Sequence, residues 1–258
     1  MLQKKPTSPF KADMQTYLGD RDNNEDRSIM LPHLGIFAIS DGMGGHANGE
    51  HVAEWCIEAI KKSTQGRKLQ IPLDAMGRKR PEEIEFFKQL LPQLNKELWE
   101  EAAFNPSLSG GGATLTVVHY DPSCHRCYYA HCGDSRLYHL RALRQTDGRS
   151  KWSYTFRQIT KDQGYENILD NAMGVIPPNN FYAESGSFVA SKGDLLLLTT
   201  DGVHDFFDKH QPKLALKGLA VAGRYSPQSV TREILQVIHQ ANRKKQDNAT
   251  IVAVSICK

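Results

Sequence analysis

Acidic residues stand where short apolar runs of this 258-residue sequence begin or end. An aspartate at the end of an apolar run lies at the edge of the core, where desolvation makes an unpaired charge costly. The acids of this kind are Asp41, Asp201, Asp134, Asp247, Glu25 and Asp26. They come without a matching His or Cys cluster, and Mg²⁺ and Mn²⁺ prefer oxygen ligands in octahedral geometry. The sequence therefore predicts a site for a hard divalent cation.

Simpler explanations exist for individual motifs. A single Asp-Gly is ordinary turn chemistry, and residues 42–47 satisfy the G-x-G-x-x-G/A fingerprint of dinucleotide-binding loops. However, the carboxylate of Asp41 just before that loop would repel a pyrophosphate. About 20 positions further on, where such loops are followed by an acid for the ribose, residues 61–64 read Lys-Lys-Ser-Thr. A nucleotide-binding oxidoreductase is therefore disfavoured.

The elements that must position these acids are short strands and a few longer helices. Apolar runs of strand length follow one another directly over 113–140, which favours hairpins and largely antiparallel sheets. Apolar residues recur at helical spacing in 50–62, in 84–104 and in 226–242. Pro92 should kink or divide the second of these helices. The pattern predicts an α+β chain.

Length and composition fit one globular domain, since 40% of the residues are hydrophobic. We expect a flexible N-terminal tail over 1–11 and a single domain over 12–258. Basic and acidic residues nearly balance, 32 against 29, which argues against nucleic-acid binding and against a polybasic membrane surface. No apolar run reaches the roughly 20 residues of a membrane span. The odd number of cysteines, five, favours reduced thiols, so we expect a cytoplasmic protein.

An ordered set of motifs extends over residues 17–256. The motifs are Arg21-Asp-Asn-Asn-Glu25-Asp26, Asp41-Gly-Met-Gly-Gly45 with Gly49-Glu50, Gly112-Ala-Thr114, Gly133-Asp-Ser-Arg136, Gln158-Ile-Thr-Lys-Asp162, Asp201-Gly-Val-His-Asp205 and Asp247-Asn248. In order and approximate spacing they resemble the metal-dependent protein serine/threonine phosphatases of the PP2C (PPM) family, bacterial type. Each motif alone is weak, but the ordered set is specific.

This resemblance implies a four-layer α-β-β-α sandwich of two antiparallel sheets flanked by helix pairs, with a centre of two Mn²⁺ or Mg²⁺ ions at one end. Matched motif by motif, Asp41 corresponds to the carboxylate that bridges both metals and Gly42 to a backbone carbonyl ligand. Asp201 and Asp247 would hold one metal. The ligands of the other, directly or through waters, would be Glu25 and Asp26.

Arg21 matches the phosphate-binding arginine of the family. The resemblance implies two catalytic residues, Arg21 and Asp41. The planar guanidinium of Arg21 can bind two phosphate oxygens at once. The alternative for Arg21 is an exposed arginine in a surface ion pair. The family chemistry is attack on phosphorus by a water that two metal ions activate, without a phosphoenzyme.

Two further aspartates, Asp134 and Asp205, match residues that hold a third, weaker metal in many members of the family. Simpler roles are open for both. Asp134 could pair with Arg136, and Asp205 could cap the following turn.

The proton donor to the leaving group is not defined by the motifs. Met43 stands where animal members of the family carry a histidine proposed as general acid. His46 is a candidate donor, and a metal-bound water is another. A surface or helix-capping role is the alternative for His46.

The clearest departure from the family follows Asp162. Other members insert a flap of several dozen residues there, whereas this sequence continues through 163–166 almost at once into Asn167-Ile-Leu-Asp-Asn-Ala-Met-Gly174. The flap segment is nearly absent. Because loops beside a site shield it and select substrates, we expect a more open metal centre and an altered affinity for the third metal.

These features predict a protein-serine/threonine phosphatase that opposes a Ser/Thr kinase. The alternative is a catalytically silent regulatory or phosphoprotein-binding module of the same fold. By resemblance, the partners would be phosphorylated proteins, including a cognate Ser/Thr kinase and its substrates.

Overall fold

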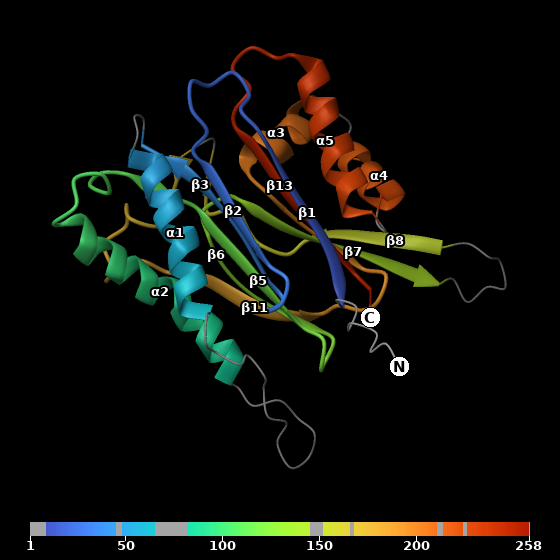
Figure 1. Ribbon diagram of the computed structural model, residues 1–258, viewed down its shortest axis with the longest axis horizontal. Helices are drawn as coiled ribbons and strands as arrows, with labels where there is room; N and C mark the ends of the chain where they lie inside the picture. Colours follow the sequence, from blue (N-terminus) through green and yellow to red (C-terminus); the bar gives the residue numbers. More distant parts are fainter. Residues whose placement is uncertain are drawn as a thin grey trace, which may run out of the picture.

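The computed structural model describes residues 9–44, 48–64, 82–144, 152–165, 168–210, 214–223 and 226–257. Two antiparallel sheets form its centre (Figure 1). One has the strand order β1 (Phe10–Tyr17), β13 (Ala249–Ile256), β12 (Leu195–Thr199), β7 (Arg136–Arg144) and β8 (Trp152–Gln158). The other has the order β11 (Glu184–Val189), β6 (Arg126–Cys132), β5 (Leu115–Asp121), β3 (Ile36–Met43) and β2 (Asp26–Leu31), with β4 (Gly112–Ala113) paired to β3.

Helices cover the outer face of each sheet (Figure 1). The six-stranded sheet carries α1 (Asn48–Thr64) and α2 (Glu82–Ala102), and the five-stranded sheet carries α3 (Asp201–His210), α4 (Leu214–Gly223) and α5 (Pro227–Ala241). The sandwich of two antiparallel sheets between helical layers confirms the sequence prediction. One layer, however, holds three helices rather than a pair, and α2 continues through Pro92 undivided. No helix in the described ranges is both long and apolar enough to cross a membrane.

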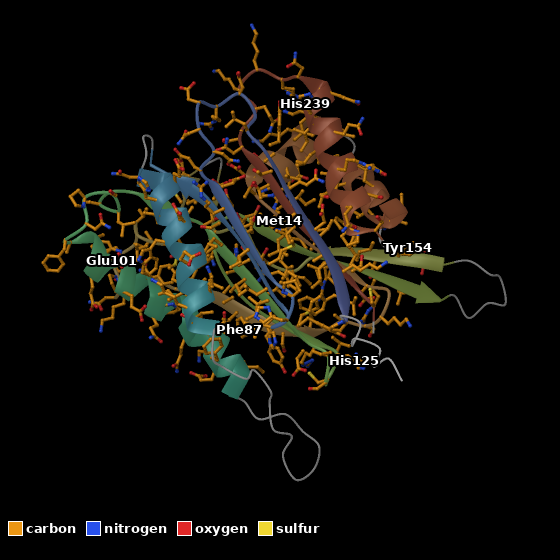
Figure 2. The ribbon with its side chains drawn as sticks, viewed as in Figure 1. Met14, Phe87, Glu101, His125, Tyr154 and His239 are labelled. Atoms are coloured by element: carbon orange, nitrogen blue, oxygen red, sulfur yellow. The ribbon has the colours of Figure 1, made fainter. Side chains whose placement is uncertain are left out.

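The apolar runs are continuous because both faces of the central strands are buried. Along β3, Ile36 and Ala38 pack under α1 and α2, whereas Phe37 and Ile39 pack between the two sheets. The leucines of β12 alternate in the same way between the helical face and the intersheet face. Figure 2 shows the side chains that fill these layers. Since side chains alternate across a strand, a residue two positions beyond Ile39 faces the other sheet.

The termini of the described chain lie in one sheet. Phe10 pairs with Ile256 and Tyr17 with Ala249 along the full length of β1 and β13. Phe10 and Lys11 were assigned to the N-terminal tail, but β1 begins at Phe10, so the tail prediction was two residues too long. Residues 1–8 lie outside the described ranges.

Candidate metal centre

Asp26 and Asp41 are direct partners in the antiparallel pairing of β2 with β3. Opposed residues of such a pair project to the same side of the sheet. By the alternation of β3, that side faces the five-stranded sheet. Asp26 is 5% exposed, and its Oδ2 accepts a hydrogen bond of 2.9 Å from Thr200 Oγ1. The hydrogen bond joins the two sheets at the end where the acids collect.

Asp201 and Asp247 come from the opposite sheet. Asp201 is the first residue of α3, just after β12, and Asp247 lies just before β13. The end of β12 lies beside the start of β13 because the two strands are antiparallel neighbours. Asp41, near the end of β3, and Asp201, just after β12, therefore lie at the same end of the sandwich, each brought there by its own apolar strand.

Burial and mutual repulsion raise the pKa values of these carboxyl groups. The pKa of Asp41 is raised well above its ordinary value by burial, and then by Asp26, Asp201, Asp134 and Asp247. Burial, followed by the charges of the neighbouring aspartates, raises the pKa of Asp201 to about 8. Burial raises the pKa of Asp26 to about 7, against the opposing hydrogen bonds from threonines. A bound divalent cation would offset both the burial of the carboxylates and their mutual repulsion.

The donor set fits a hard cation. Asp26 Oδ1 and Asp201 Oδ1 are buried and have no hydrogen-bond partner, which is costly for a carboxylate unless a cation compensates it. The converging donors are all oxygens, as Mg²⁺ and Mn²⁺ require. No group of three or more His, Cys, Asp or Glu side chains within the described ranges is already gathered in metal-holding geometry. The fit therefore depends on the donor chemistry and on the two orphaned oxygens.

Two glycines let the backbone approach this cluster. A Cβ on Gly42 would lie 2.4 Å from the carbonyl oxygen of Gly49, and a Cβ on Gly49 would lie 2.7 Å from Glu25 Oε2. The amide of Gly42 donates to the carbonyl of Glu25 at 3.2 Å. The start of α1 thus packs directly on the end of β3 and on the loop of Glu25. Gly45 and His46, the candidate proton donor, lie outside the described residues.

Asn248 positions the acidic loop, a role that the sequence did not reveal. Its Oδ1 accepts from the amide of Glu25 at 2.9 Å, and its Nδ2 donates to the carbonyls of Leu18 at 2.6 Å and Asn23 at 3.0 Å. These partners are more than 220 positions away in the chain. The Asp247-Asn248 motif was the available signal, but only the fold shows what the amide contacts.

Thr114 holds the backbone of Asp41 in a similar way. The amide of Asp41 donates to Thr114 Oγ1 at 3.0 Å, and the amide of Thr114 donates to the Asp41 carbonyl at 2.9 Å. Thr114 Oγ1 also shares a 2.7 Å hydrogen bond with Ser135 Oγ, beside Asp134. The Gly112-Ala-Thr114 and Gly133-Asp-Ser-Arg136 motifs therefore meet at Asp41.

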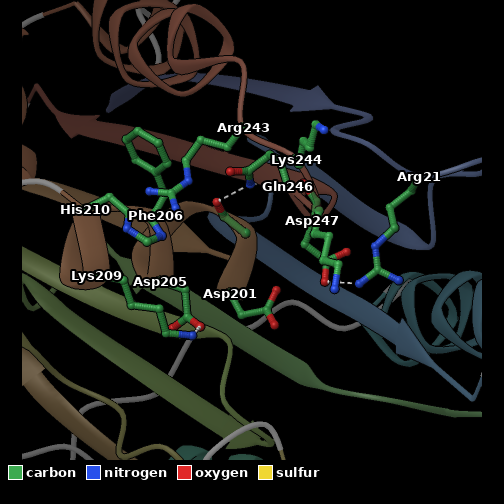
Figure 3. A pocket seen from close by; sticks show the side chains of 12 residues that line it. Arg21, Asp201, Asp205, Phe206, Lys209, His210, Arg243, Lys244, Gln246 and Asp247 are labelled. Atoms are coloured by element: carbon green, nitrogen blue, oxygen red, sulfur yellow. Dashed lines mark hydrogen bonds and ion pairs between the residues drawn. The ribbon is translucent and has the colours of Figure 1, made fainter.

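Arg21 lies at the mouth of the site. Its Nη2 is 2.5 Å from Asp247 Oδ2, and its side chain is 54% exposed. Arg21 therefore forms the surface ion pair that was the alternative to phosphate binding, but its partner is a candidate metal ligand, so the guanidinium lies beside the proposed metal centre. Arg21, Asp201 and Asp247 line a pocket of about 480 Å³ (Figure 3).

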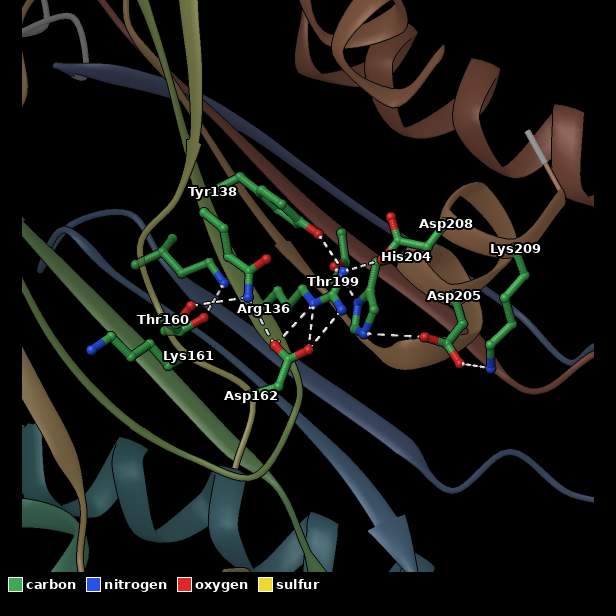
Figure 4. A network of polar contacts seen from close by, with 12 residues as sticks. Arg136, Tyr138, Thr160, Lys161, Asp162, Thr199, His204, Asp205, Asp208 and Lys209 are labelled. Carbon is green, nitrogen blue, oxygen red and sulfur yellow. Dashed lines mark hydrogen bonds and ion pairs between the residues drawn. The ribbon is translucent and has the colours of Figure 1, made fainter. Parts of the chain in front are cut away.

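The simpler roles suggested for the candidate third-site residues are wrong. Arg136 pairs with Asp162 at 2.6 Å and Asp208 at 2.7 Å, and forms no ion pair with Asp134 in the described chain (Figure 4). Asp205 lies inside α3 rather than at its cap and pairs with Lys209. Burial, and then the charge of Asp162, raises the pKa of Asp134 to about 6.

A short hairpin, β9 (Gly164–Tyr165) with β10 (Ile168–Leu169), follows Asp162 in place of a long flap. Gln163 anchors it to the Asp134 loop, because its amide donates to the Gly133 carbonyl at 2.9 Å and its Oε1 accepts from the Gly133 amide at 3.1 Å. Residues 166 and 167 lie outside the described ranges.

A family model decides the classification. The model of the family described as Stage II sporulation protein E (SpoIIE) matches residues 37–256. The chain belongs to this family. The resemblance to the PP2C (PPM) phosphatases, inferred from the order of the motifs, is thereby confirmed, and the domain is of the SpoIIE/PP2C type.

Named relatives of this SpoIIE/PP2C-type chain are bacterial phosphatases. It is 29% identical over 205 residues to the serine/threonine protein phosphatase PstP of Mycobacterium tuberculosis, a match that covers 72% of this chain and 34% of PstP. It is 28% identical over 250 residues to the serine/threonine phosphatase stp of Listeria monocytogenes, with 91% of this chain and 90% of stp covered. The chain thus spans about a third of PstP and most of stp.

Solved structures share the fold. PppA, described as a key regulatory component of the type VI secretion system (T6SS) in Pseudomonas aeruginosa, superposes with a TM-score of 0.72 at 24% identity, covering 96% of this chain and 98% of PppA. The catalytic domain of PstP, solved in complex with two manganese ions, superposes with a TM-score of 0.71 at 22% identity, covering 96% and 99%.

Proposed function

We propose that this chain is a protein-serine/threonine phosphatase that hydrolyses phosphoserine and phosphothreonine in proteins with the help of two Mn²⁺ or Mg²⁺ ions. The observation that carries the proposal is that Asp26, Asp201 and Asp247, from two different sheets, all lie close enough to Asp41 to raise its pKa, and that Asp26 and Asp201 each bury a carboxylate oxygen without a hydrogen-bond partner. The relatives named as serine/threonine phosphatases support the same activity.

Each residue of the centre has a distinct role in this proposal. Asp41 would contact both ions, Asp201 and Asp247 would hold one, and Asp26 with Glu25 and the carbonyl of Gly42 would hold the other. Two such ions lower the pKa of a water and neutralise the charge of a phosphoryl group. Asp134 and Asp205 would hold a third, weaker ion.

The protein's own residues orient the substrate and the ligands. Arg21 can present two parallel N–H donors to a phosphate at the mouth of the pocket. The hydroxyl of Thr200 donates to Oδ2 of Asp26, and Oδ1, which has no hydrogen-bond partner, is available to a metal ion. Thr114 and Asn248 fix the backbones of Asp41 and Glu25, so the acidic groups are preorganised.

The physiological partners follow from this activity. Phosphorylated proteins are the substrates, and a Ser/Thr kinase with its targets is the system that such an enzyme opposes. We place the reaction in the cytoplasm, which agrees with five cysteines that are all free thiols.

The test is hydrolysis of a phosphothreonine peptide and of p-nitrophenyl phosphate as a function of Mn²⁺ concentration, after chelation. The wild-type protein should turn over both substrates only with the metal, and Asp41→Asn should lose turnover. Metal binding without any turnover would instead favour a silent phosphoprotein-binding module. Every acidic residue expected of the metal centre is present in the sequence, which favours the active enzyme over the silent module.

A further inference from the structure

One wall of the pocket beside the metal centre is strongly basic. The cations that line it in the described part of the chain include Arg21, Lys209, Arg243, Lys244 and Lys245. Three consecutive cations of this set, Arg243, Lys244 and Lys245, follow the end of α5, and we call them the basic turn. The three acids of the pocket are Asp201 and Asp205 on α3 and Asp247 just before β13 (Figure 3).

The basic turn is fixed in place rather than free to swing. Helix α5 ends at Ala241, and the left-handed backbone of its C-cap residue Asn242 (φ 44°) reverses the chain. The amide of Lys245 donates to Asp20 Oδ2 at 2.8 Å, and the amide of Asp20 donates to the Gln246 carbonyl at 2.7 Å. Gln246 Nε2 donates to the carbonyl of Gly202 at 3.0 Å. These bonds join the turn to the loop that carries Arg21 and to the start of α3.

The cations of the basic turn are available to a ligand. Arg21 pairs with Asp247 and Lys209 pairs with Asp205, so these two charges are matched within the pocket. No acidic side chain in the described chain pairs with Arg243, Lys244 or Lys245, which are all exposed. Arg243 reaches toward His210 (Figure 3). Desolvation, and then the charges of Arg243 and Lys209, lower the pKa of His210, as expected in a positive field.

We propose that the basic turn binds a second anionic group of the substrate, either an acidic side chain or another phosphate near the phosphorylated residue. This inference rests on the proposed phosphatase function and adds a substrate preference to it. The phosphate to be hydrolysed approaches Arg21 and the metal centre, while the neighbouring anion lies against Arg243, Lys244 and Lys245 across the same pocket. Arginine can bind a carboxylate or a phosphate with two parallel hydrogen bonds.

The proposal is tested with three phosphothreonine peptides that differ only in their flanks, which are neutral, glutamate-rich or carry a second phosphothreonine. The values of kcat/KM are divided by the turnover of p-nitrophenyl phosphate by the same protein. The test variant is Arg243→Gln/Lys244→Gln/Lys245→Gln, because glutamine removes the charge, remains polar and unbranched at Cβ, and leaves the backbone hydrogen bonds of the turn in place. The control variant, Lys62→Gln/Lys88→Gln/Lys96→Gln, removes the same charge from exposed positions of α1 and α2.

Wild type and control should prefer the anionic peptides over the neutral one by about tenfold at low salt, as expected for a few exposed ion pairs. The test variant should reduce that preference to within about twofold, and added salt should do the same to wild type. A preference in the test variant equal to that of the control would overturn the proposal. The two anionic peptides distinguish a carboxylate site from a phosphate site.

Failure of the proposed function would look different, because no protein would then turn over any substrate. In that case the same peptides are tested by fluorescence anisotropy for binding to the Mn²⁺-loaded proteins. Tighter binding of the anionic peptides by about tenfold, lost in the test variant alone, would still support the basic turn. Equal binding of all three peptides by wild type would refute it.

Discussion

Asp26 and Asp41 face each other across the β2–β3 ladder, and the hydroxyl of Thr200 from the opposite sheet donates to Asp26 at 2.9 Å. When both are ionised, the carboxylates of Asp26 and Asp41 thus place two negative charges side by side at the border of the hydrophobic core. Such an arrangement destabilises the ionised chain unless a cation is bound. The consequence is a set of measurable links between pH, divalent metal and stability.

The first prediction concerns the stability of the chelated protein. Folding raises the pKa of Asp201 to about 8 and that of Asp26 to about 7, so the folded state binds more protons than the unfolded one. Their contribution to stability is greatest below about pH 4 and falls as pH rises toward 8, by at most about 1.4 kcal/mol per pH unit and per group.

Asp201→Asn should therefore stabilise the chelated protein at pH 8 and leave it unchanged at pH 4, as measured by urea unfolding at both values. The lowered pKa values of His131 and His204 give the stability the opposite pH dependence. This contribution cancels when the effect of the substitution on the free energy of unfolding at pH 4 is subtracted from its effect at pH 8, because both proteins contain the two histidines. Equal effects of Asp201→Asn at the two pH values would contradict the raised pKa of Asp201.

The second prediction concerns Arg21. Arg21→Ala removes a bidentate phosphate donor, and kcat/KM for a phosphothreonine peptide should fall by about 10- to 100-fold. Arg21→Lys should restore only part of this loss, because lysine provides a point charge without the planar fork. The half-saturating Mn²⁺ concentration should not rise, since Asp247 only loses its ion-pair partner. If kcat/KM fell because Mn²⁺ bound more weakly, Arg21 would act by positioning the metal ligand Asp247 rather than by binding the substrate phosphate.

The third prediction concerns the glycine contact between β3 and α1. Gly49→Ala places a Cβ 2.7 Å from Glu25 Oε2 and 2.8 Å from the amide of Met43, so it should destabilise the protein by about 2 kcal/mol and weaken metal binding. The matched control is Gly218→Ala in α4, where a Cβ meets nothing within 4 Å. That change should stabilise the helix by up to about 1 kcal/mol. Similar unfolding midpoints for the two variants would contradict the close approach.

The fourth prediction concerns the third ion. Asp134→Asn should raise the half-saturating metal concentration for turnover by about 10-fold, while the stoichiometry of tight binding stays at two. Asp208→Asn is the control, because Asp208 contacts Arg136 without being a proposed ligand. If turnover in both variants depends on metal as in wild type, Asp134 has no part in metal binding.

Much of the site could be predicted from sequence because its acids stand at strand ends. An apolar run that finishes in Asp-Gly brings its carboxylate to the end of the sheet, where it borders the core, so Asp41 and Asp201 could be proposed as site residues before the fold was known. The order of the motifs gave the fold class. Phe10 was misassigned because a strand whose partner is Ile256 has no local signal that separates it from a tail.

The supporting residues could not be predicted, because their partners are remote in the chain. Asn248 contacts Glu25 across 223 positions and Thr114 contacts Asp41 across 73. The basic turn could not be predicted either, because positive and negative charges nearly balance over the whole chain. Only the packing of α5 against α3 places its local excess of positive charge at the pocket. Composition averages charge, whereas binding depends on its position.

The central claim, that acids from both sheets form a two-metal phosphatase centre, is tested most directly by anomalous diffraction from crystals soaked in Mn²⁺. We predict two manganese peaks in the space between Asp26, Asp41, Asp201 and Asp247, with Asp41 in contact with both and with the unpaired oxygens of Asp26 and Asp201 directed to them. Manganese peaks elsewhere, or none within reach of Asp41 at saturating metal, would contradict it.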